Sequence, residues 1–393
     1  MRMRSIGIAA LLLLAACGGE PEAPAEGGGD VGELLGGGET AGYARAAGER
    51  AFTFPADHGP HPDYRQEWWY FTGNLESEQG RRLGYQITLF RNAVAPKAPA
   101  LDSAWATNQV WMGHLAVTDP EGGRFVFDER FARGALDQAG ARAEPFAAWL
   151  GPWRMEAAGE GAGESAGESG PPPFRIRAAG EDFRIDLTLA PGKPPVLHGD
   201  GGLSQKGPEA GNASWYYSLP RLPTRGQVAI RGEQWSVTGA SWLDREWSTS
   251  ALGEGQTGWD WFALQLEDGR DLMIYQIREA GGESAPQSYA TWMDAEGERE
   301  PALDFTAIEL EPVAYWQSPE TGARYPVEWR LALPGENEAW TVRAVQPAQE
   351  LRTFVTYWEG AVDVRAAGEA IGRGYLEMTG YADSSADSSR SSR

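Results

Sequence analysis

The chain has 393 residues, which is enough for two domains, and a formal net charge of −22 at pH 7. This acidity argues against nucleic-acid binding, because a phosphate backbone needs a basic surface, and it disfavours attachment to anionic headgroups. The 17 tryptophans fit either an aromatic ligand pocket or a β-rich core. The one cysteine excludes an intramolecular disulfide and a cysteine-based zinc site.

The chain opens with a secretory signal. Two arginines precede an apolar run over residues 6–14, which is shorter than the about 20 residues that span a bilayer. The LAAC run at 14–17 resembles a bacterial lipoprotein box, in which Cys17 is lipidated and becomes the mature N-terminus. We therefore expect a signal over 1–16 and a cell-envelope lipoprotein held in the membrane through Cys17. Gly18 suggests the periplasmic face of the outer membrane.

Composition divides the rest of the chain. Residues 17–50 are rich in Gly, Ala, Glu and Pro and predict a flexible tether, and 382–393 predict a disordered tail. A similar stretch at 156–173 predicts an expanded loop within the first domain. We expect that domain to cover 51–211 and a second to cover 212–381.

Between these breaks, apolar and polar residues alternate with a period of two, and turn residues separate the runs. The predicted strands cover 85–90, 114–119, 183–189, 227–231, 259–266, 271–278, 288–294, 325–333 and 340–345. No amphipathic helix is predicted after residue 50. Many short strands with regular turns predict an all-β protein made of two β-barrels or sandwiches.

Several segments, in order, resemble the carotenoid 1,2-hydratase/AttH family. They include QEWWYFTGNL (66–75), SWLDREWSTS (241–250), GWDWFALQLEDGRDLMIYQIR (258–278) and GRGYLEMTGY (372–381). The resemblance implies two tandem lipocalin-like β-barrel domains packed together. It also implies either acid-catalysed addition of water to an apolar alkene or, in lipoprotein members, an accessory role beside an ABC-type exporter.

Asp244 and Glu246 are the first candidate catalytic residues. In a strand they share one face with Trp242, while Arg245 takes the other face. The corresponding strand of the hydratases resembles Asp-His-Asn, which gives Asp244 the role of the acid. A carboxylic acid in an apolar aromatic pocket stays protonated near neutral pH. The alternative is an ionised carboxylate paired with arginine, and Arg245 favours this alternative because it replaces the histidine.

Glu67 and His114 are further catalytic candidates. Glu67 shares a strand face with Trp69, where a carboxylate needs a partner or a function, and pairing with an arginine is the simpler reading. His114 begins a strand and is either structural or a proton carrier. The histidines form no HExxH or HxH pattern, so we expect no metal site and no cofactor.

The expected ligand is an apolar small molecule or lipid in an aromatic cleft between the two barrels. The residues expected to bind it are Trp69, His198, Trp215, Tyr217, Trp242, Trp259, Trp261 and Gln276. An enzyme of hydratase or hydrolase type and a non-catalytic lipid carrier both predict such a cleft. A pure scaffold predicts fully packed tryptophans and no cavity.

Overall fold

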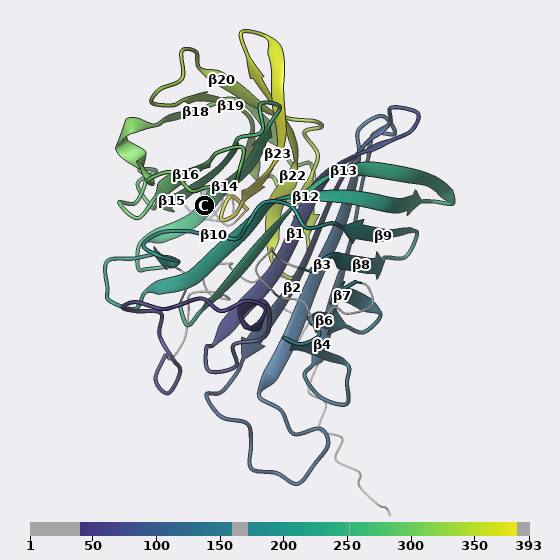
Figure 1. Cartoon of the computed structure of the whole chain (residues 1–393), viewed down its shortest axis with the longest axis vertical. Coiled ribbons are helices and arrows are strands. Elements are labelled where there is room, and N and C mark those ends of the chain that lie inside the picture. Colours follow the sequence, from purple (N-terminus) through teal and green to yellow (C-terminus); the bar gives the residue numbers. More distant parts are fainter. Residues whose placement is uncertain (1–39, 159–171, 251, 383–393) are drawn as a thin grey trace, which may run out of the picture.

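The computed structural model describes residues 40–158, 172–250 and 252–382, and within them the protein is all-β (Figure 1). The helical content there is limited to the 3-10 turns η1 (Ala56–His58) and η2 (Phe305–Ala307). No helix in these ranges is long and apolar enough to cross a membrane. The predicted signal, Cys17, the first part of the tether and most of the tail lie outside the described residues, as does the middle of the 156–173 loop.

The first sheet has 13 strands in the order β4-β3-β2-β1-β13-β12-β9-β8-β7-β6-β5, with β10 and β11 also paired to β12. Its strands are β1 (Gln66–Ser77), β2 (Arg82–Ala93), β3 (Gln109–Asp119), β4 (Arg124–Arg133), β5 (Ala139–Arg142), β6 (Ala147–Leu150), β7 (Trp153–Ala157), β8 (Phe174–Ala179), β9 (Phe183–Leu189), β10 (Val196–Leu197), β11 (Leu203–Gln205), β12 (Ala213–Ile230) and β13 (Glu233–Ser248).

The second sheet has 10 strands in the order β17-β16-β15-β14-β23-β22-β20-β19-β18, with β21 paired to β22. Its strands are β14 (Gln256–Leu266), β15 (Asp271–Glu279), β16 (Tyr289–Met293), β17 (Leu303–Asp304), β18 (Glu309–Gln317), β19 (Arg324–Ala332), β20 (Trp340–Ala344), β21 (Glu350–Arg352), β22 (Thr356–Ala366) and β23 (Glu369–Met378). All pairings within both sheets are antiparallel.

The two curled sheets lie against each other, which confirms the predicted fold class (Figure 1). Three apolar cores result. One fills the first sheet around Phe71 and Leu187, and another fills the second sheet around Phe262 and Trp329. The third lies between the sheets, where β1 contacts β23 and β2 contacts β22. A strand of either sheet is therefore buried on both faces wherever it reaches this middle layer.

The chain crosses from the first sheet to the second at a later position than the predicted domain boundary at 211/212. Both β12 and β13 belong to the first sheet, so the crossing lies between Ser248 and Gln256. The tight turn at Arg231 and Gly232 joins these two strands into one long hairpin, and both residues have positive φ angles. This hairpin carries Asp244 and Glu246 on the first sheet, where they face the second.

Candidate active site in a cavity between the two sheets

A mostly apolar row of side chains crosses β13, β1, β2, β3 and β4 on the face toward the second sheet. Because strands in register place paired residues side by side, the row is continuous. Its members are, in order, Glu246, Trp68, Phe90, Met112 and Phe131. All but Phe131 line a cavity between the sheets.

The next row on the same face is polar. It begins one strand earlier, on β12, and ends at β4. Its members are, in order, Ser218, Asp244, Tyr70, Thr88, His114 and Glu129. The period-two alternation of each strand thus places a band of hydrogen-bonding groups beside the apolar row.

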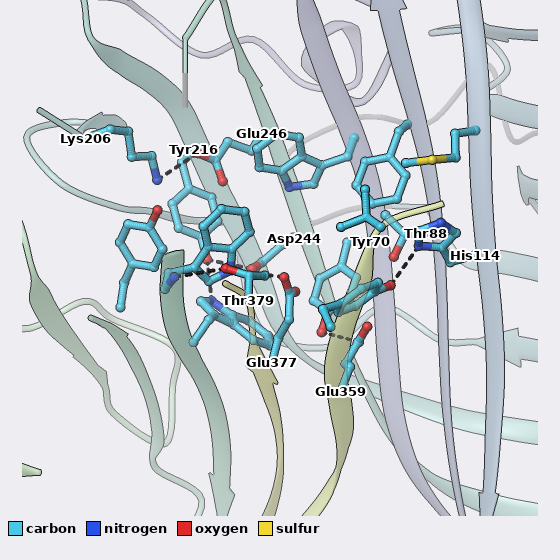
Figure 2. Close-up of a pocket in the computed structure, with 18 residues that line it drawn as sticks. Tyr70, Thr88, His114, Lys206, Tyr216, Asp244, Glu246, Glu359, Glu377 and Thr379 are labelled. Carbon is cyan, nitrogen blue, oxygen red and sulfur yellow. Dashed lines mark hydrogen bonds and ion pairs between the residues drawn. The ribbon is translucent and has the colours of Figure 1, made fainter. Parts of the chain in front are cut away.

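The second sheet supplies a third row, which closes the cavity from the opposite side (Figure 2). It crosses β16, β15, β14, β23 and β22 through Tyr289, Tyr275, Trp261, Glu377 and Glu359, and all of these except Tyr289 line the cavity. The cavity holds about 850 Å³ of empty space, part of it open to solvent.

Asp244 is buried at the cavity wall and accepts hydrogen bonds at both carboxyl oxygens. Trp242 Nε1 donates to Oδ1 over 2.6 Å and Tyr216 OH donates to Oδ2 over 2.6 Å. Ser218 Oγ also donates to Oδ1. Burial raises the pKa of Asp244, these three hydrogen bonds lower it and nearby Glu246 raises it, with a net value of about 7.

Glu377 and Glu359 face the same cavity from the second sheet. Burial raises the pKa of Glu377 to about 8 against one opposing hydrogen bond, which Trp259 Nε1 donates over 3.0 Å. The pKa of Glu359 is raised well above its usual range by burial and by Glu377, and Tyr70 OH donates to it over 2.6 Å. Within the described chain, none of Asp244, Glu359 and Glu377 forms an ion pair with a basic side chain.

Glu246 is paired instead of free. Lys206 Nζ lies 2.8 Å from Glu246 Oε1, and both side chains are buried. The same ammonium group lies 4.1 Å from the ring centroid of Tyr275. This end of the cavity is therefore neutralised by a cation, whereas the region around Asp244 and Glu377 is not.

Arg245 points away from the cavity into the first core, so the predicted pairing of Asp244 with arginine is wrong. Arg245 forms an ion pair with Glu67, and its guanidinium carbon Cζ lies 3.9 Å from the ring centroid of Trp69. Arg91 also pairs with Glu67. Burial alone would raise the pKa of Glu67, but the two guanidinium groups lower it below its usual range. The sequence-based preference for structural pairing of Glu67 with an arginine is confirmed.

The sequence profile of the AttH-like family matches residues 45–381. This chain belongs to the AttH-like family. The resemblance inferred from the sequence segments is thereby confirmed. No curated protein has a significant sequence match to the chain.

Solved structures show the same fold for this AttH-like protein. An AttH protein from Nitrosomonas europaea is 36% identical with a TM-score of 0.74, over 86% of this chain and 99% of that chain. Kievitone hydratase from Nectria haematococca is 16% identical with a TM-score of 0.60, over 84% of this chain and 92% of that chain. At that identity the second likeness establishes the fold alone.

The structure brings some predicted site residues together and separates others. Asp244, Glu246, His114, Trp259 and Trp261 line the cavity of the AttH-like protein. His114 Nδ1 lies 2.8 Å from Tyr357 OH, and Nε2 lies 3.0 Å from Glu129 Oε1. The other predicted residues are not part of the lining.

Most of the residues outside the lining pack in a core or bond to a neighbouring side chain. Trp69, Trp215 and Tyr217 pack in the first core with Glu67, so their predicted contact with a cavity ligand is wrong. Gln276 donates to Ser284 Oγ over 2.7 Å, outside the lining. They were misplaced because an aromatic residue on a strand fits a barrel interior as well as a cavity.

Two predicted residues act behind the lining. Trp242 is not part of the lining, but it donates a hydrogen bond to Asp244 and packs edge-on against the lining residue Trp261, with ring centroids 6.2 Å apart. His198 is buried, with Nε2 2.7 Å from Ser218 Oγ, which itself donates to Asp244. His198 therefore orients Ser218, a hydrogen-bond partner of Asp244, and does not itself line the cavity.

Sequence reasoning missed Glu359 and Glu377, which lie in YWEGAV (357–362) and GRGYLEMTGY (372–381). The signal was present, because each is a lone carboxylate in an otherwise apolar run of a central strand. It also missed Lys206, Tyr216 and Trp68. Within the described residues, no group of three or more His, Cys, Asp or Glu side chains is arranged to hold a metal ion.

Proposed function

We propose that this AttH-like protein binds an apolar small molecule in the cavity and adds water across a carbon–carbon double bond. One observation carries the proposal. Asp244 and Glu377, on opposite sheets, both face a cavity lined by Trp68, Trp259 and Trp261, and neither has a basic partner among the described residues. A carboxyl group that can donate a proton and a second one that can accept a proton are what acid–base addition of water requires.

Glu377 is suited to give a proton to carbon. Its pKa of about 8 keeps it mostly protonated at neutral pH. Transfer of that proton to one alkene carbon leaves a carbocation on the other. The faces of the neighbouring tryptophans stabilise such a cation through their quadrupoles, and the apolar walls keep bulk water away from it.

Asp244 is suited to accept a proton from the attacking water. Its oxygens accept hydrogen bonds from Ser218, Tyr216 and Trp242, an arrangement that favours the carboxylate. The water oxygen bonds to the cation while one of its protons passes to Asp244, which leaves an alcohol. The cycle closes when Asp244 loses this proton to solvent and Glu377 takes one up. This assignment makes Asp244 the base, in contrast to the acid role that the family resemblance suggests.

The lining sets the class of substrate. Aromatic and aliphatic side chains form most of the cavity wall, so the reacting part of the ligand is apolar and of terpenoid or lipid-like character. The hydrogen-bonding band that includes Thr88 and His114 fits one polar group on an otherwise apolar body.

The test is incorporation of oxygen-18 from labelled water. The purified full chain is incubated with a panel of terpenoid and fatty alkenes, and products carrying the label are detected by mass spectrometry. Glu377→Gln and Asp244→Asn are each expected to lower the rate at least about 100-fold, as for loss of a general acid or base. Glu369→Gln, an exposed change on the same strand β23, is the matched control and keeps the rate.

A non-catalytic role is the alternative, in which the cavity carries a lipid for an ABC-type exporter. The lipoprotein box before Cys17 favours it, because it places the chain at a membrane without requiring chemistry. In that case the same ligands bind the wild type and both acid variants equally, and no alkene gains oxygen-18. Co-purification with exporter subunits then becomes the positive test.

Attachment to the cell envelope through Cys17, at the periplasmic face of the outer membrane, is part of the proposal. The support is the signal pattern of the first 17 residues. Cys17→Ser is expected to move the protein from the washed membrane fraction to the soluble fraction. Retention of the variant with the outer membrane would contradict lipid anchoring at this residue.

A further inference from the structure

Exposed apolar side chains gather at one end of the first sheet. Among the described residues, eight large hydrophobic side chains are exposed. Six of them lie near the end of the first sheet where β2 ends at Ala93, β3 begins at Gln109 and β4 ends at Arg133. We call these six the apolar rim. They are Val94, Leu101, Trp105, Phe131, Leu136 and Phe354, between 47% and 70% exposed.

The apolar rim is continuous with the cavity. Phe131 is paired across the ladder with Met112, which lines the cavity beside Phe90. On the other side, Phe354 packs edge-on against Phe131 with ring centroids 5.9 Å apart, and its neighbour Val355 is a lining residue. An apolar path therefore runs from the surface to the cavity wall.

On the first sheet, the partly exposed lining residues lie on the side of the apolar rim. Trp68 and Phe90, in the apolar row, are partly exposed, whereas Tyr70, Thr88 and His114 of the polar row are buried. The apolar row is also the one closer to Ala93, where β2 ends. The cavity thus has its more accessible side toward the apolar rim and its hydrogen-bonding band deeper inside.

The described chain also starts at this end. Tyr43 OH donates to Ala93 O over 2.8 Å, and Gly42 packs against Pro96 so closely that a Cβ there would lie 3.0 Å from the Pro96 ring. Residues before Thr40 therefore leave the domain next to the loop that carries Leu101. A tether from Cys17 to this point has about 23 residues, so an anchor at Cys17 keeps this end of the sheet near the membrane.

The loop between β2 and β3 does not share the strong negative charge of the whole protein. Residues 94–108 contain one lysine, Lys97, and one aspartate, Asp102, so the loop is neutral within a chain of net charge −22. Neutral, apolar loops with a tryptophan are suited to the headgroup–acyl boundary of a bilayer, where the ring buries its apolar body and keeps its N–H hydrated. Isolated exposed hydrophobics are common, but a cluster of this kind marks a contact surface.

We propose that the apolar rim inserts into the surface of a lipid bilayer, so that the cavity opens toward the membrane and exchanges its apolar ligand with it. This goes beyond the chemistry proposed for the cavity and does not depend on it, because a carrier and an enzyme would both use this entrance. The partner of the apolar rim is the bilayer surface and not a second protein.

The experiment measures fluorescence quenching by bromine in the acyl chains. The full chain is reconstituted in phosphatidylcholine vesicles that carry brominated acyl chains, and the quenched fraction is compared with that in unbrominated vesicles. Trp105→Phe is expected to remove a resolvable part of the quenched emission, since bromine quenches indoles in direct contact. Trp316→Phe, which changes a partly exposed tryptophan on β18, is the matched control and leaves the quenched part unchanged.

A second pair of variants tests the same surface by charge. Leu101→Glu with Phe354→Glu is expected to lower bromine quenching of Trp105 several-fold, while Val313→Glu with Tyr315→Glu on β18 does not. All four positions are exposed, so these variants fold. Equal quenching in the wild type and Trp105→Phe overturns the proposal. So does a concentration-dependent dimer in sedimentation that the Leu101 and Phe354 changes dissociate, because it assigns the rim to a second copy.

Discussion

Glu359 on β22 lies directly opposite Glu377 on β23, and both carboxyl groups line the same cavity. Like charges at directly opposed positions destabilise a ladder, and burial makes the repulsion stronger. The pair is compatible with the fold because the pKa values of both groups are raised, Glu377 to about 8. The raised pKa values favour the protonated form of both carboxyl groups, which removes the repulsion between them.

The first prediction concerns stability and pH. The pKa of Glu377 is about 8 in the folded chain against an ordinary value of 4.5, so folding favours its protonated form. Its contribution to stability is present at low pH and is lost as the pH rises from about 5 through about 8. The shift corresponds to at most about 5 kcal/mol. Glu377→Gln cannot ionise, so it should lose less stability than the wild type over this range.

Urea unfolding at intervals between about pH 5 and about pH 9 measures this difference. The exposed variant Glu369→Gln should follow the wild-type curve. If Glu377→Gln runs parallel to the wild type at every pH, then Glu377 is ionised in the folded protein and the acid role proposed for it is lost.

The second prediction concerns the hydrogen bonds to Asp244. Tyr216→Phe removes a donor that stabilises the carboxylate, so the pKa of Asp244 should rise above its value of about 7. Carbon-13 NMR of labelled aspartate, assigned with Asp244→Asn, reports the titration directly. Tyr85→Phe removes a buried hydroxyl that is bonded to Ser241 in the first core and should leave the titration unchanged. A downward shift in Tyr216→Phe would contradict the arrangement.

The third prediction concerns the buried pair of Arg245 and Glu67. Arg245→Met leaves Arg91 as the one arginine beside the buried Glu67 carboxylate and should destabilise the protein by about 3–5 kcal/mol. Adding Glu67→Gln should lower the stability further, because the buried Arg91 guanidinium then loses its carboxylate partner. Arg330→Ala, in an exposed pair with Glu309, should cost at most about 1 kcal/mol. Free energies from chemical denaturation test all of these values.

The fourth prediction concerns Lys206 and Glu246. Lys206→Met should destabilise the chain by a few kcal/mol, about 3 by analogy with other broken buried pairs, and Lys206→Met with Glu246→Gln should restore much of it. The coupling free energy from this double-mutant cycle is the measured quantity. A coupling near zero would mean that the two charges do not interact in solution.

The sequence by itself determined which side chains share a face. The period-two pattern of SWLDREWSTS separated Trp242, Asp244 and Glu246 from Arg245, because successive residues of any strand point to opposite sides. For the same reason the alternation predicted the all-β class. It also placed Glu67 on the face of β1 that carries Trp69.

Only the tertiary structure decided what each face meets. A strand such as β13 has one face in a barrel interior and one against the second sheet. The order of the strands decides which is which, and that order cannot be inferred from the neighbouring residues in the sequence. Hence Asp244 was expected to pair with an arginine, but Arg245 pairs with Glu67, and Trp215 was expected in a cleft but lies in the first core.

Partners that are distant in sequence were beyond the sequence for the same reason. Glu377 and Asp244 come from different sheets, and only the packing of one sheet on the other brings both carboxyl groups to one cavity. Their raised pKa values follow from that burial and not from sequence neighbours. The alternation of residues thus fixed the chemistry available on each strand face, and the packing of the two sheets selected which of it forms the site.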